Sequence, residues 1–474
     1  MEAVANGTAR AQVIDNDPSA EIEASIPRAD PRRTETQACA FPVDTGQILA
    51  NLLRRYEEVG EPLAVSFRDL VPWIRMGERA THHIHTYPAK LLPQIAHFFL
   101  ANTSFAGVDE TILDPFGGTG TVALETVLSG RPALYADANP LARLISSTKT
   151  RRIDRTLLTR AFGEVKASYA RSRARKRPDV VNLDRWFEPA TISKLIRLRA
   201  AILGVEPPEI RDVLLVTFSA ALRKASLADP RFSVPVRRRD IDIPKSKADA
   251  WHLFEQQFLA NTQRLANLER LYTGNAAAKL CGTDARSLRC PESGALLQDG
   301  SVGMILTSPP YAGAQKYVRA ASLSLGWLDM AGVGQLRPLE DATIGREHFS
   351  RAQHNIVTPT NVAAADALLA QIREINPARA LIAATYLNEM RDALRESVRV
   401  LRPGGKLVLV IGDNTVCGHQ FRTSDYLETI LQDLGMTTTL ALVDDIKSRG
   451  LMTRRAATAG VIATEQVIVF SKEE

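Results

Sequence analysis

Short apolar runs alternate along the chain with segments whose apolar residues recur every three or four positions. The apolar runs end in turn-forming or polar residues and predict strands at Thr111–Asp114, Ala133–Asp137, Ala278–Cys281, Val302–Leu306 and Lys406–Ile411. Helical periodicity lies between them, at Val122–Leu128, Leu141–Ser147 and Leu381–Leu401. Strands that alternate with helices in this way indicate an α/β fold whose sheet is mostly parallel.

Two regions depart from this alternation. Near the C-terminus, Met436–Val443 and Glu465–Phe470 are rich in β-forming residues and are joined by a polar, glycine-bearing stretch. This pair predicts a β-hairpin at the end of the sheet. Residues 151–275 are rich in Leu, Ala and Arg and mostly helical in period, as in Ile192–Leu203 and Ile210–Leu222. They predict a mainly helical insertion into the α/β domain.

These patterns divide the 474 residues into four parts. A tail at 1–45 is rich in Ala, Thr, Pro and Asp, lacks apolar periodicity and is expected to be disordered. The α/β domain is expected in two halves, at 46–150 and 276–474, with the helical insertion at 151–275 between them. No internal repeat is evident.

The overall composition excludes several classes of protein. An apolar fraction of 45% and a charged fraction of 24% exclude a wholly disordered, collagen-like or disulfide-stapled chain. No apolar run approaches about 18 residues, and the N-terminus lacks a secretory signal, so we expect a cytoplasmic protein without a membrane partner. The 4 cysteines are scattered and the 8 histidines show no ligand spacing, so no metal site is predicted.

The net charge of +6 conceals an uneven distribution. Residues 1–45 carry 8 acidic and 4 basic side chains, whereas residues 143–251 carry 25 basic and 12 acidic ones. A local excess of positive charge indicates a polyanionic partner, although solvated helix faces would explain it equally well. The arginines we single out as nucleic-acid contacts in this segment are Arg171, Arg173, Arg175, Arg237 and Arg238.

A glycine-rich loop, Asp114–Thr121, lies between a predicted strand and a predicted helix. Glycines let a backbone turn tightly there and approach a ligand beyond the carboxyl ends of the strands. Asp137 ends the next predicted strand, 23 residues after Asp114, where a carboxylate can accept hydrogen bonds from ribose hydroxyls. The pattern predicts an adenosine-containing cofactor, dinucleotides included. No lysine follows the glycines, so the loop is not a Walker loop.

The segment Thr307–Tyr311 (Thr-Ser-Pro-Pro-Tyr) follows the predicted strand Val302–Leu306. The Pro309 nitrogen donates no hydrogen bond, and the carbonyls of Ser308 and Pro309 are left free to accept. Such acceptors suit an exocyclic amino group, and Tyr311 offers a ring face for stacking on a planar base. The alternative is a rigid loop with a packed tyrosine, which the neighbouring cofactor loop disfavours.

In this order, the motifs resemble those of the amino-methyltransferases that use S-adenosylmethionine to methylate exocyclic nitrogens of DNA bases. The resemblance implies a Rossmann-like methyltransferase sheet that ends in a hairpin. It implies catalytic residues at Ser308, Pro309, Pro310 and Tyr311. It implies an S-adenosylmethionine site formed by Tyr87, Lys90, Asp114, Pro115, Phe116, Gly117, Gly118, Thr119, Gly120, Asp137, Asn139 and Asp284.

Further segments match family motifs over roughly residues 75–142 and 277–474. They are His85–Leu91, Gly282–Leu288, the turn Leu401–Gly405 before strand five, and Gly412–Asn414 near the target base. The cofactor half precedes the catalytic half, whereas many cytosine-N4 enzymes have the reverse order. In the family, target recognition resides in a variable segment, so we expect residues 151–275, with 330–375, to engage DNA. Arg319, just beyond the Ser-Pro-Pro-Tyr motif, is a further candidate contact.

The resemblance implies methylation of the N4 amine of cytosine in double-stranded DNA, because Ser308 has the form of the motif associated with that target. Three alternatives stay open: an adenine-N6 enzyme, an RNA exocyclic-amine methyltransferase and a non-catalytic nucleic-acid-binding protein. Cytosine-C5 chemistry is disfavoured because it needs a nucleophilic thiol and no Pro-Cys dipeptide is present. The enzyme is expected either to act alone or to have a cognate restriction endonuclease as partner.

Overall fold

An eight-stranded sheet organises the fold, with the strand order β1-β9-β10-β6-β5-β2-β3-β4. The computed structural model describes residues 43–74, 79–87, 90–239, 249–272, 274–312, 317–446 and 464–474. Most of the predicted tail at 1–45 lies outside these ranges. The strands are β1 Leu63–Val65, β2 Ile112–Asp114, β3 Ala133–Ala136, β4 Ala278–Gly282, β5 Val302–Thr307, β6 Leu401–Ile411, β9 Met436–Asp445 and β10 Thr464–Lys472.

The pairing of the strands confirms the predicted α/β class. Strand β10 runs antiparallel to both β6 and β9, and the other neighbours in the sheet are parallel. The antiparallel pair β9–β10 is the predicted hairpin, whose connection at 447–463 lies outside the described residues. A parallel sheet in which the cofactor-loop strand β2 lies beside β5, with one antiparallel strand near the edge, is a Rossmann-like arrangement.

One predicted boundary is wrong. The segment Leu401–Gly405 was expected to form a turn before strand five, but β6 already begins at Leu401. The pairing with β5 shifts between Val302, which lies opposite Leu401, and Met304, which lies opposite Lys406. The Pro-Gly-Gly stretch is therefore a bulge within the strand, and Gly404, with φ of +68°, supplies the positive φ for it.

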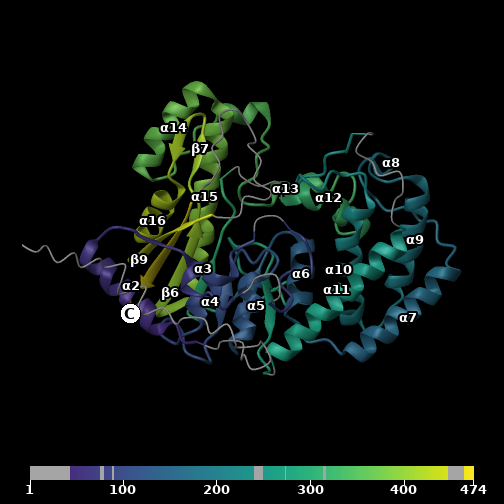
Figure 1. The fold of residues 1–474 in the computed structure, drawn as a ribbon. Coiled ribbons are helices and arrows are strands. Elements are labelled where there is room, and N and C mark those ends of the chain that lie inside the picture. The colour runs from purple at the N-terminus through teal and green to yellow at the C-terminus, as the bar shows by residue number, and fades with distance from the viewer. Residues whose placement is uncertain are drawn as a thin grey trace, which may run out of the picture.

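Helices cover both faces of the sheet (Figure 1). Helices α14 (Ala363–Ile375), α15 (Pro377–Val400) and α16 (Thr423–Asp433) pack on one face, against Leu407, Leu409 and Ile411. Helices α2 (Gly46–Val59), α3 (Phe67–Leu70) and α4 (Pro93–Leu100) pack on the other, against Val408 and Val410. Burial on both faces explains why β5 and β6 are continuous apolar runs in the sequence.

The predicted insertion forms a helical lobe beside the sheet, on the right in Figure 1. Between β3 and β4 the chain forms α6 (Pro140–Thr150), α7 (Arg155–Arg171), α8 (Leu183–Trp186), α9 (Pro189–Leu203), α10 (Pro208–Ala225) and α11 (Ala250–Leu271). The lobe also includes α12 (Tyr317–Trp327), which follows β5, and α13 (Leu336–Asp341) packs beside it. Trp327 of α12 lies edge-on to the rings of Phe187 and Phe218.

Helix α12 thus joins the chain that follows the Ser-Pro-Pro-Tyr motif to the core of the basic insertion. Within the described residues, no helix combines the length and apolar character that crossing a membrane requires. Two short strands, β7 (Asn414–Val416) and β8 (His419–Phe421), pair antiparallel outside the main sheet.

Candidate functional site

The glycine loop connects β2 to helix α5 (Thr121–Leu128). The Gly117 N–H donates to the Ala136 carbonyl at 2.8 Å, and the Gly120 N–H donates to the Gly117 carbonyl at 2.7 Å. Gly118 and Gly120 have φ values of +49° and +73°. A Cβ atom on Gly120 would lie 2.9 Å from Ser146 Oγ of α6. Glycine is required here because the loop turns within a space that a side chain would fill.

Asp137 follows β3 and faces this loop. Its Oδ2 accepts a hydrogen bond from the Gly118 N–H at 2.9 Å, and its Oδ1 accepts one from the Asn139 N–H at 2.7 Å. Burial raises the pKa of Asp137, while these two N–H groups and the nearby Arg143 oppose the rise. Each carboxylate oxygen retains a further lone pair, so the residue fits the predicted contact with ribose hydroxyls.

Asp114 joins the cofactor loop to the Ser-Pro-Pro-Tyr motif. Its Oδ1 accepts from the Thr307 hydroxyl at 2.6 Å and from the Phe116 N–H at 3.1 Å. Burial raises the pKa of Asp114 to about 7. Thr307 ends β5 and directly precedes Ser308, so one side chain fixes the distance between the two motifs. Pro115 and Thr119 are buried in the same loop, and Phe116 is partly buried.

Tyr87 closes the site from the segment before α4. Its hydroxyl accepts a hydrogen bond from Asn139 Nδ2 at 2.9 Å, while Asn139 Oδ1 caps α6 by accepting from the Leu141 N–H. The Tyr87 ring stacks on the ring of Tyr317, with centroids 6.3 Å apart and planes 17° apart. The motif around Tyr87 therefore contacts both the cofactor side of the site and α12.

Lys90, another predicted cofactor residue, holds the same segment together. Its Nζ donates to the His85 carbonyl at 2.8 Å and to the His82 carbonyl at 3.2 Å. Burial, with Arg264 nearby, lowers the pKa of Lys90 to about 8. Pro88 and Ala89, between Tyr87 and Lys90, lie outside the described residues. These contacts indicate that Lys90 stabilises the backbone conformation at His82 and His85.

The Ser-Pro-Pro-Tyr motif leaves β5 at the carboxyl edge of the sheet. Ser308 and Tyr311 are partly buried. The Tyr311 hydroxyl donates to Glu465 Oε1 of β10 at 2.8 Å. Asn414 Nδ2 donates to the Ala312 carbonyl at 2.7 Å, and Asn414 Oδ1 is buried without a hydrogen-bond partner in the described part of the chain. Asn414 of the motif at 412–414 thus contacts the residue that directly follows the Ser-Pro-Pro-Tyr motif.

Asp284 lies two residues beyond β4, next to β3 in the sheet. Arg286 donates to both of its carboxylate oxygens, from Nε at 2.9 Å and from Nη2 at 2.9 Å. Arg286 Nη1 also donates to Glu389 Oε1 of α15 at 3.1 Å. Sequence motifs had not identified Arg286 or Glu389, because their pairing depends on how α15 packs on the sheet.

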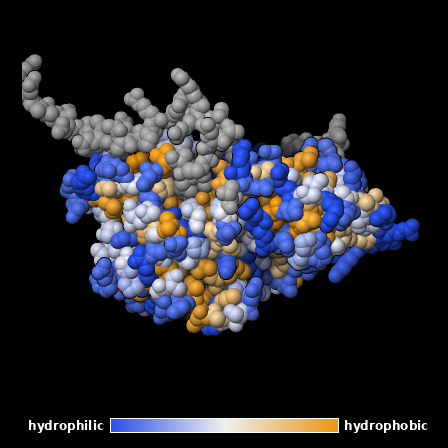
Figure 2. Space-filling view, turned by 90° about the horizontal axis from the view of Figure 1, so that it is seen from below, coloured by the Kyte–Doolittle hydropathy of each residue, from blue (hydrophilic) through white to orange (hydrophobic). Residues whose placement is uncertain are grey.

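Most of the candidate DNA-contact residues are exposed. Arg171, Arg173, Arg175 and Arg237 are exposed on the insertion, and Arg319 is exposed on α12. Arg238 is partly buried, and its Nε donates to the Ala228 carbonyl at 3.1 Å. Figure 2 shows hydrophilic residues at the far right of the view, where the insertion ends. Within the described ranges, no three His, Cys, Asp or Glu side chains are grouped as metal ligands would be.

Comparison with known proteins supports the predicted family. The Type II methyltransferase M.MvaI of Kocuria varians is 22% identical over 356 residues, which cover 71% of this chain and 77% of that protein. The Type II methyltransferase M.MjaII of Methanocaldococcus jannaschii is 33% identical over 73 residues, 15% of this chain and 13% of that protein. No protein-family model matches the chain.

The similarity to these relatives agrees with the predicted family of S-adenosylmethionine-dependent methyltransferases. The strand order and the glycine loop with Asp137 agree with this family. Two solved methyltransferases align over most of the chain. A S-adenosylmethionine-dependent methyltransferase of Methanosarcina mazei has a TM-score of 0.30 and 12% identity, with 81% of this chain and 99% of that chain covered. The rRNA methyltransferase aviRa of Streptomyces viridochromogenes has a TM-score of 0.29 and 11% identity, with 86% and 96% covered.

Replacing Asp137 with alanine should weaken S-adenosylmethionine binding about 10- to 100-fold, because a charged acceptor is lost and the Gly118 N–H loses its partner. Calorimetric titration with the cofactor measures the effect, and DNA binding should survive. The matched control is Asp109→Ala, since Asp109 is an exposed aspartate just before β2. Equal affinities in the two variants would remove Asp137 from the cofactor site.

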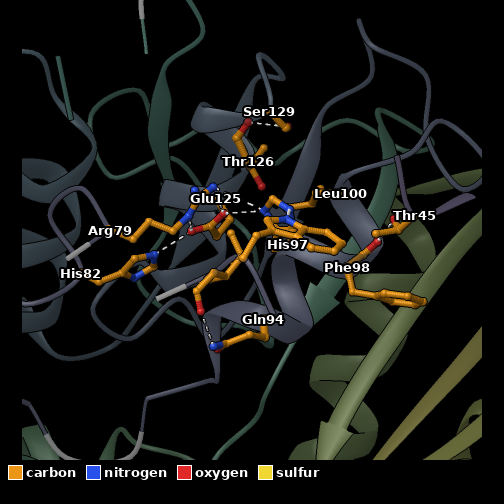
Figure 3. Close-up of polar contacts among 12 residues, drawn as sticks. Thr45, Arg79, His82, Gln94, His97, Phe98, Leu100, Glu125, Thr126 and Ser129 are labelled. Atoms are coloured by element: carbon orange, nitrogen blue, oxygen red, sulfur yellow. Dashed lines mark hydrogen bonds and ion pairs between the residues drawn. The ribbon is translucent and has the colours of Figure 1, made fainter. Parts of the chain in front are cut away.

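A buried ionic network supports the segment predicted to line the cofactor site (Figure 3). Glu125 of α5 is fully buried, and its carboxylate accepts two hydrogen bonds from Arg79, each at 2.7 Å. His82 Nε2 lies 2.7 Å and His97 Nδ1 lies 3.5 Å from the same carboxylate. Burial lowers the pKa of His82 to about 4, so its ring is neutral near pH 7. Glu125 thus anchors the chain that leads to Tyr87.

Proposed function

We propose that the enzyme transfers a methyl group from S-adenosylmethionine to the exocyclic N4 amine of cytosine in double-stranded DNA. The observation that carries the proposal is the position of Ser308–Tyr311 at the carboxyl end of β5. This segment is tied to the cofactor loop by the 2.6 Å hydrogen bond from Thr307 to Asp114. The Type II methyltransferase relatives support DNA as the substrate.

The residues at this corner suit a weakly nucleophilic amine. The lone pair of the cytosine amino nitrogen is delocalised into the ring, so the nitrogen must become more tetrahedral to react. The Ser308 side chain and the Pro309 carbonyl can accept its two N–H bonds and favour that geometry. The Tyr311 ring can stack on a base that has been flipped out of the duplex.

When bound, S-adenosylmethionine supplies an electrophilic methyl group on its sulfonium. The chain has to bring the amine into line with that methyl group and exclude competing water. Asp137 binds the cofactor, and Ser308 and Tyr311 bind the base. Asp114 fixes the distance between the cofactor loop and the Ser-Pro-Pro-Tyr motif. Positioning of this kind supplies a large part of the rate enhancement in group transfer.

The identity of the methylated base is the direct test. Wild-type enzyme, S-adenosylmethionine and unmethylated duplex DNA are incubated, the DNA is digested to nucleosides, and these are weighed by mass spectrometry. We expect N4-methylcytosine. N6-methyladenine instead would overturn the choice of base, and labelled methyl transfer to tRNA or rRNA but not to duplex DNA would overturn the choice of nucleic acid.

The DNA sequence at which the enzyme acts can be identified by examining host DNA. Long-read sequencing of DNA from cells with and without the gene should reveal N4-methylcytosine at one recurring sequence. A nuclease encoded beside the gene and blocked at that sequence would be the expected cognate restriction endonuclease. Modification without such a nuclease would identify a solitary enzyme.

We further propose that the basic insertion holds the DNA backbone. Replacing Arg171, Arg173 and Arg175 together with glutamine should weaken DNA binding and reduce the slope of log K against log salt by up to about 3, roughly one per lost phosphate contact. The control removes three exposed cations outside the insertion: Arg54, Lys279 and Arg395. Salt-dependent binding isotherms measure both. Identical slopes in the two triple variants would contradict the proposal.

A further inference from the structure

Glu389 of α15 has one carboxylate oxygen that is paired and one that is not. Its Oε1 accepts from Arg286 Nη1 at 3.1 Å and from Arg346 Nη1. Its Oε2 is buried and has no hydrogen-bond partner in the described part of the chain. A buried carboxylate oxygen without a partner is costly in the free protein, so it indicates a ligand that donates a hydrogen bond to it.

Asp284, the acid that the sequence motifs place in the cofactor site, differs in this respect. Its Oδ1 accepts from the backbone N–H and from Nε of Arg286, both at 2.9 Å. Its Oδ2 accepts from Arg286 Nη2 at 2.9 Å and from Nε at 3.2 Å. A carboxylate has about four acceptor positions, so Arg286 occupies those of Asp284. Of the two acids, Glu389 has the acceptor that is left for a ligand.

The packing of α15 brings Glu389 to the predicted cofactor site. Tyr386 lies one helical turn before Glu389, on the same face of the helix. It belongs to the same core cluster as Ala136 and Ala285, the immediate neighbours of two predicted cofactor acids. Glu389 is also well covered, because its side chain is only 13% exposed.

The chain before α14 links Glu389 to the Ser-Pro-Pro-Tyr motif as well. Arg346 follows Gly345, where a Cβ atom would lie 3.7 Å from the Tyr311 carbonyl oxygen. Arg286 Nη2 donates to the Ala342 carbonyl of the same segment at 3.0 Å. The two arginines that bind Oε1 therefore come from the loop after β4 and from a segment beside the catalytic motif. Ligands of open α/β sheets bind at this carboxyl edge.

We infer that Glu389 recognises the adenine of S-adenosylmethionine by accepting a hydrogen bond from its 6-amino group, with Asp284 positioning Arg286 and thereby Glu389. The strands β5, β2, β3 and β4 are consecutive in the sheet. The methyl group has to reach the motif after β5, and the ribose is assigned to Asp137 after β3, so the base comes next, toward β4. An ionised carboxylate only accepts hydrogen bonds, and the amino group supplies the donor.

The inference rests on S-adenosylmethionine as the methyl donor of the proposed function and does not depend on which base of the nucleic acid is methylated. Burial raises the pKa of Glu389, while Arg346 and Arg286 oppose the rise and favour the ionised acceptor.

Binding of two cofactor analogues to the full-length enzyme tests the inference. S-adenosylhomocysteine carries a 6-amino group, and S-inosylhomocysteine carries a 6-oxo group in its place. In Glu389→Gln the amide oxygen should face the two arginines, because arginines only donate, and the amide nitrogen should replace Oε2. Calorimetric titration should show the ratio of the two dissociation constants shifting toward S-inosylhomocysteine by about 10- to 100-fold relative to wild type. A merely structural role would weaken both analogues equally.

Asp284→Asn supplies the contrast between the two acids. It should weaken both analogues and leave the ratio within about twofold of wild type, because Asp284 acts through Arg286. The matched control is Glu374→Gln, the same change at an exposed glutamate of α14, which should leave both dissociation constants unchanged.

An unchanged ratio in Glu389→Gln, or a shifted ratio in Asp284→Asn, would overturn the inference. If Glu389→Gln does not fold, the ratio in Asp284→Asn decides by itself in the same way. Wild-type enzyme that binds neither analogue would refute S-adenosylmethionine as the cofactor and the proposed function with it, whereas a failure confined to the ratio leaves that function intact.

Discussion

Replacing Ser308 with alanine should lower the turnover number about a hundredfold while cofactor affinity stays within about twofold of wild type. The Ser308 side chain follows β5 directly, and its neighbour Thr307 is held by Asp114 at 2.6 Å. Alanine keeps the backbone carbonyls but removes the hydroxyl acceptor that favours a tetrahedral amine. The loss should fall on the chemical step, which single-turnover methyl transfer measures directly.

The matched control for this experiment is Ser301→Ala. Ser301 is exposed at the opposite end of β5, and its hydroxyl donates to the Gln298 carbonyl at 2.6 Å, away from the site. Its turnover should equal that of wild type. Normal turnover in Ser308→Ala would show that the serine of the motif does not act in the reaction.

The sheet could be predicted from the sequence because its strands are buried on both faces. Strands β2, β3 and β5 and the Leu407–Ile411 part of β6 have continuous apolar runs that end where the chain reaches the carboxyl edge, whereas β4 contains the exposed Lys279. Strand β1 has three residues and lies at the edge beside β9, so it gave no such signal. The bulge at Gly404 was mistaken for a turn, because a Pro-Gly-Gly stretch is equally compatible with a turn and with a bulge inside a strand.

The candidate site could be predicted only in part, because only its local motifs are visible in the sequence. Glycine loops and their acidic partners are local motifs, so Gly118 and Asp137 were identified and lie 2.9 Å apart, N to Oδ2. Contacts between distant segments are not visible in a sequence. The bond from Tyr311 to Glu465 joins residues 154 positions apart, and the stacking of Tyr87 on Tyr317 depends on how α12 packs into the insertion.

The packing of α12 connects the helical insertion to the segment that follows the Ser-Pro-Pro-Tyr motif. Helix α12 begins at Tyr317, and its residue Trp327 lies in the core of the helical lobe between Phe187 and Phe218. Gly326 of the same helix lies against residue Asp179, where a Cβ atom would come within 2.7 Å of the Asp179 carbonyl oxygen. Asp179, two residues after the basic stretch at 171–177, is therefore packed against the helix that also contacts Tyr87.

The largest effect on stability should come from Glu125→Ala. The substitution should lower the free energy of unfolding by about 3–5 kcal/mol, because it leaves Arg79 buried without its charged partner. Glu125 is fully buried, and Arg79 is nearly so. His82 also loses the acceptor that lies 2.7 Å from its Nε2. Urea unfolding followed by circular dichroism measures the loss.

The site should be affected along with the fold. Arg79 and His82 begin the segment that ends in Tyr87, whose hydroxyl accepts from Asn139 at 2.9 Å. Glu125→Gln, which keeps one acceptor oxygen, should be intermediate in stability. The control is Glu164→Ala on α7, where an exposed glutamate pairs with Arg160 at 3.7 Å and its loss should change stability by no more than about 0.5 kcal/mol. Equal stability of the Glu125 and Glu164 variants would mean that the buried network does not hold the cofactor segment in place.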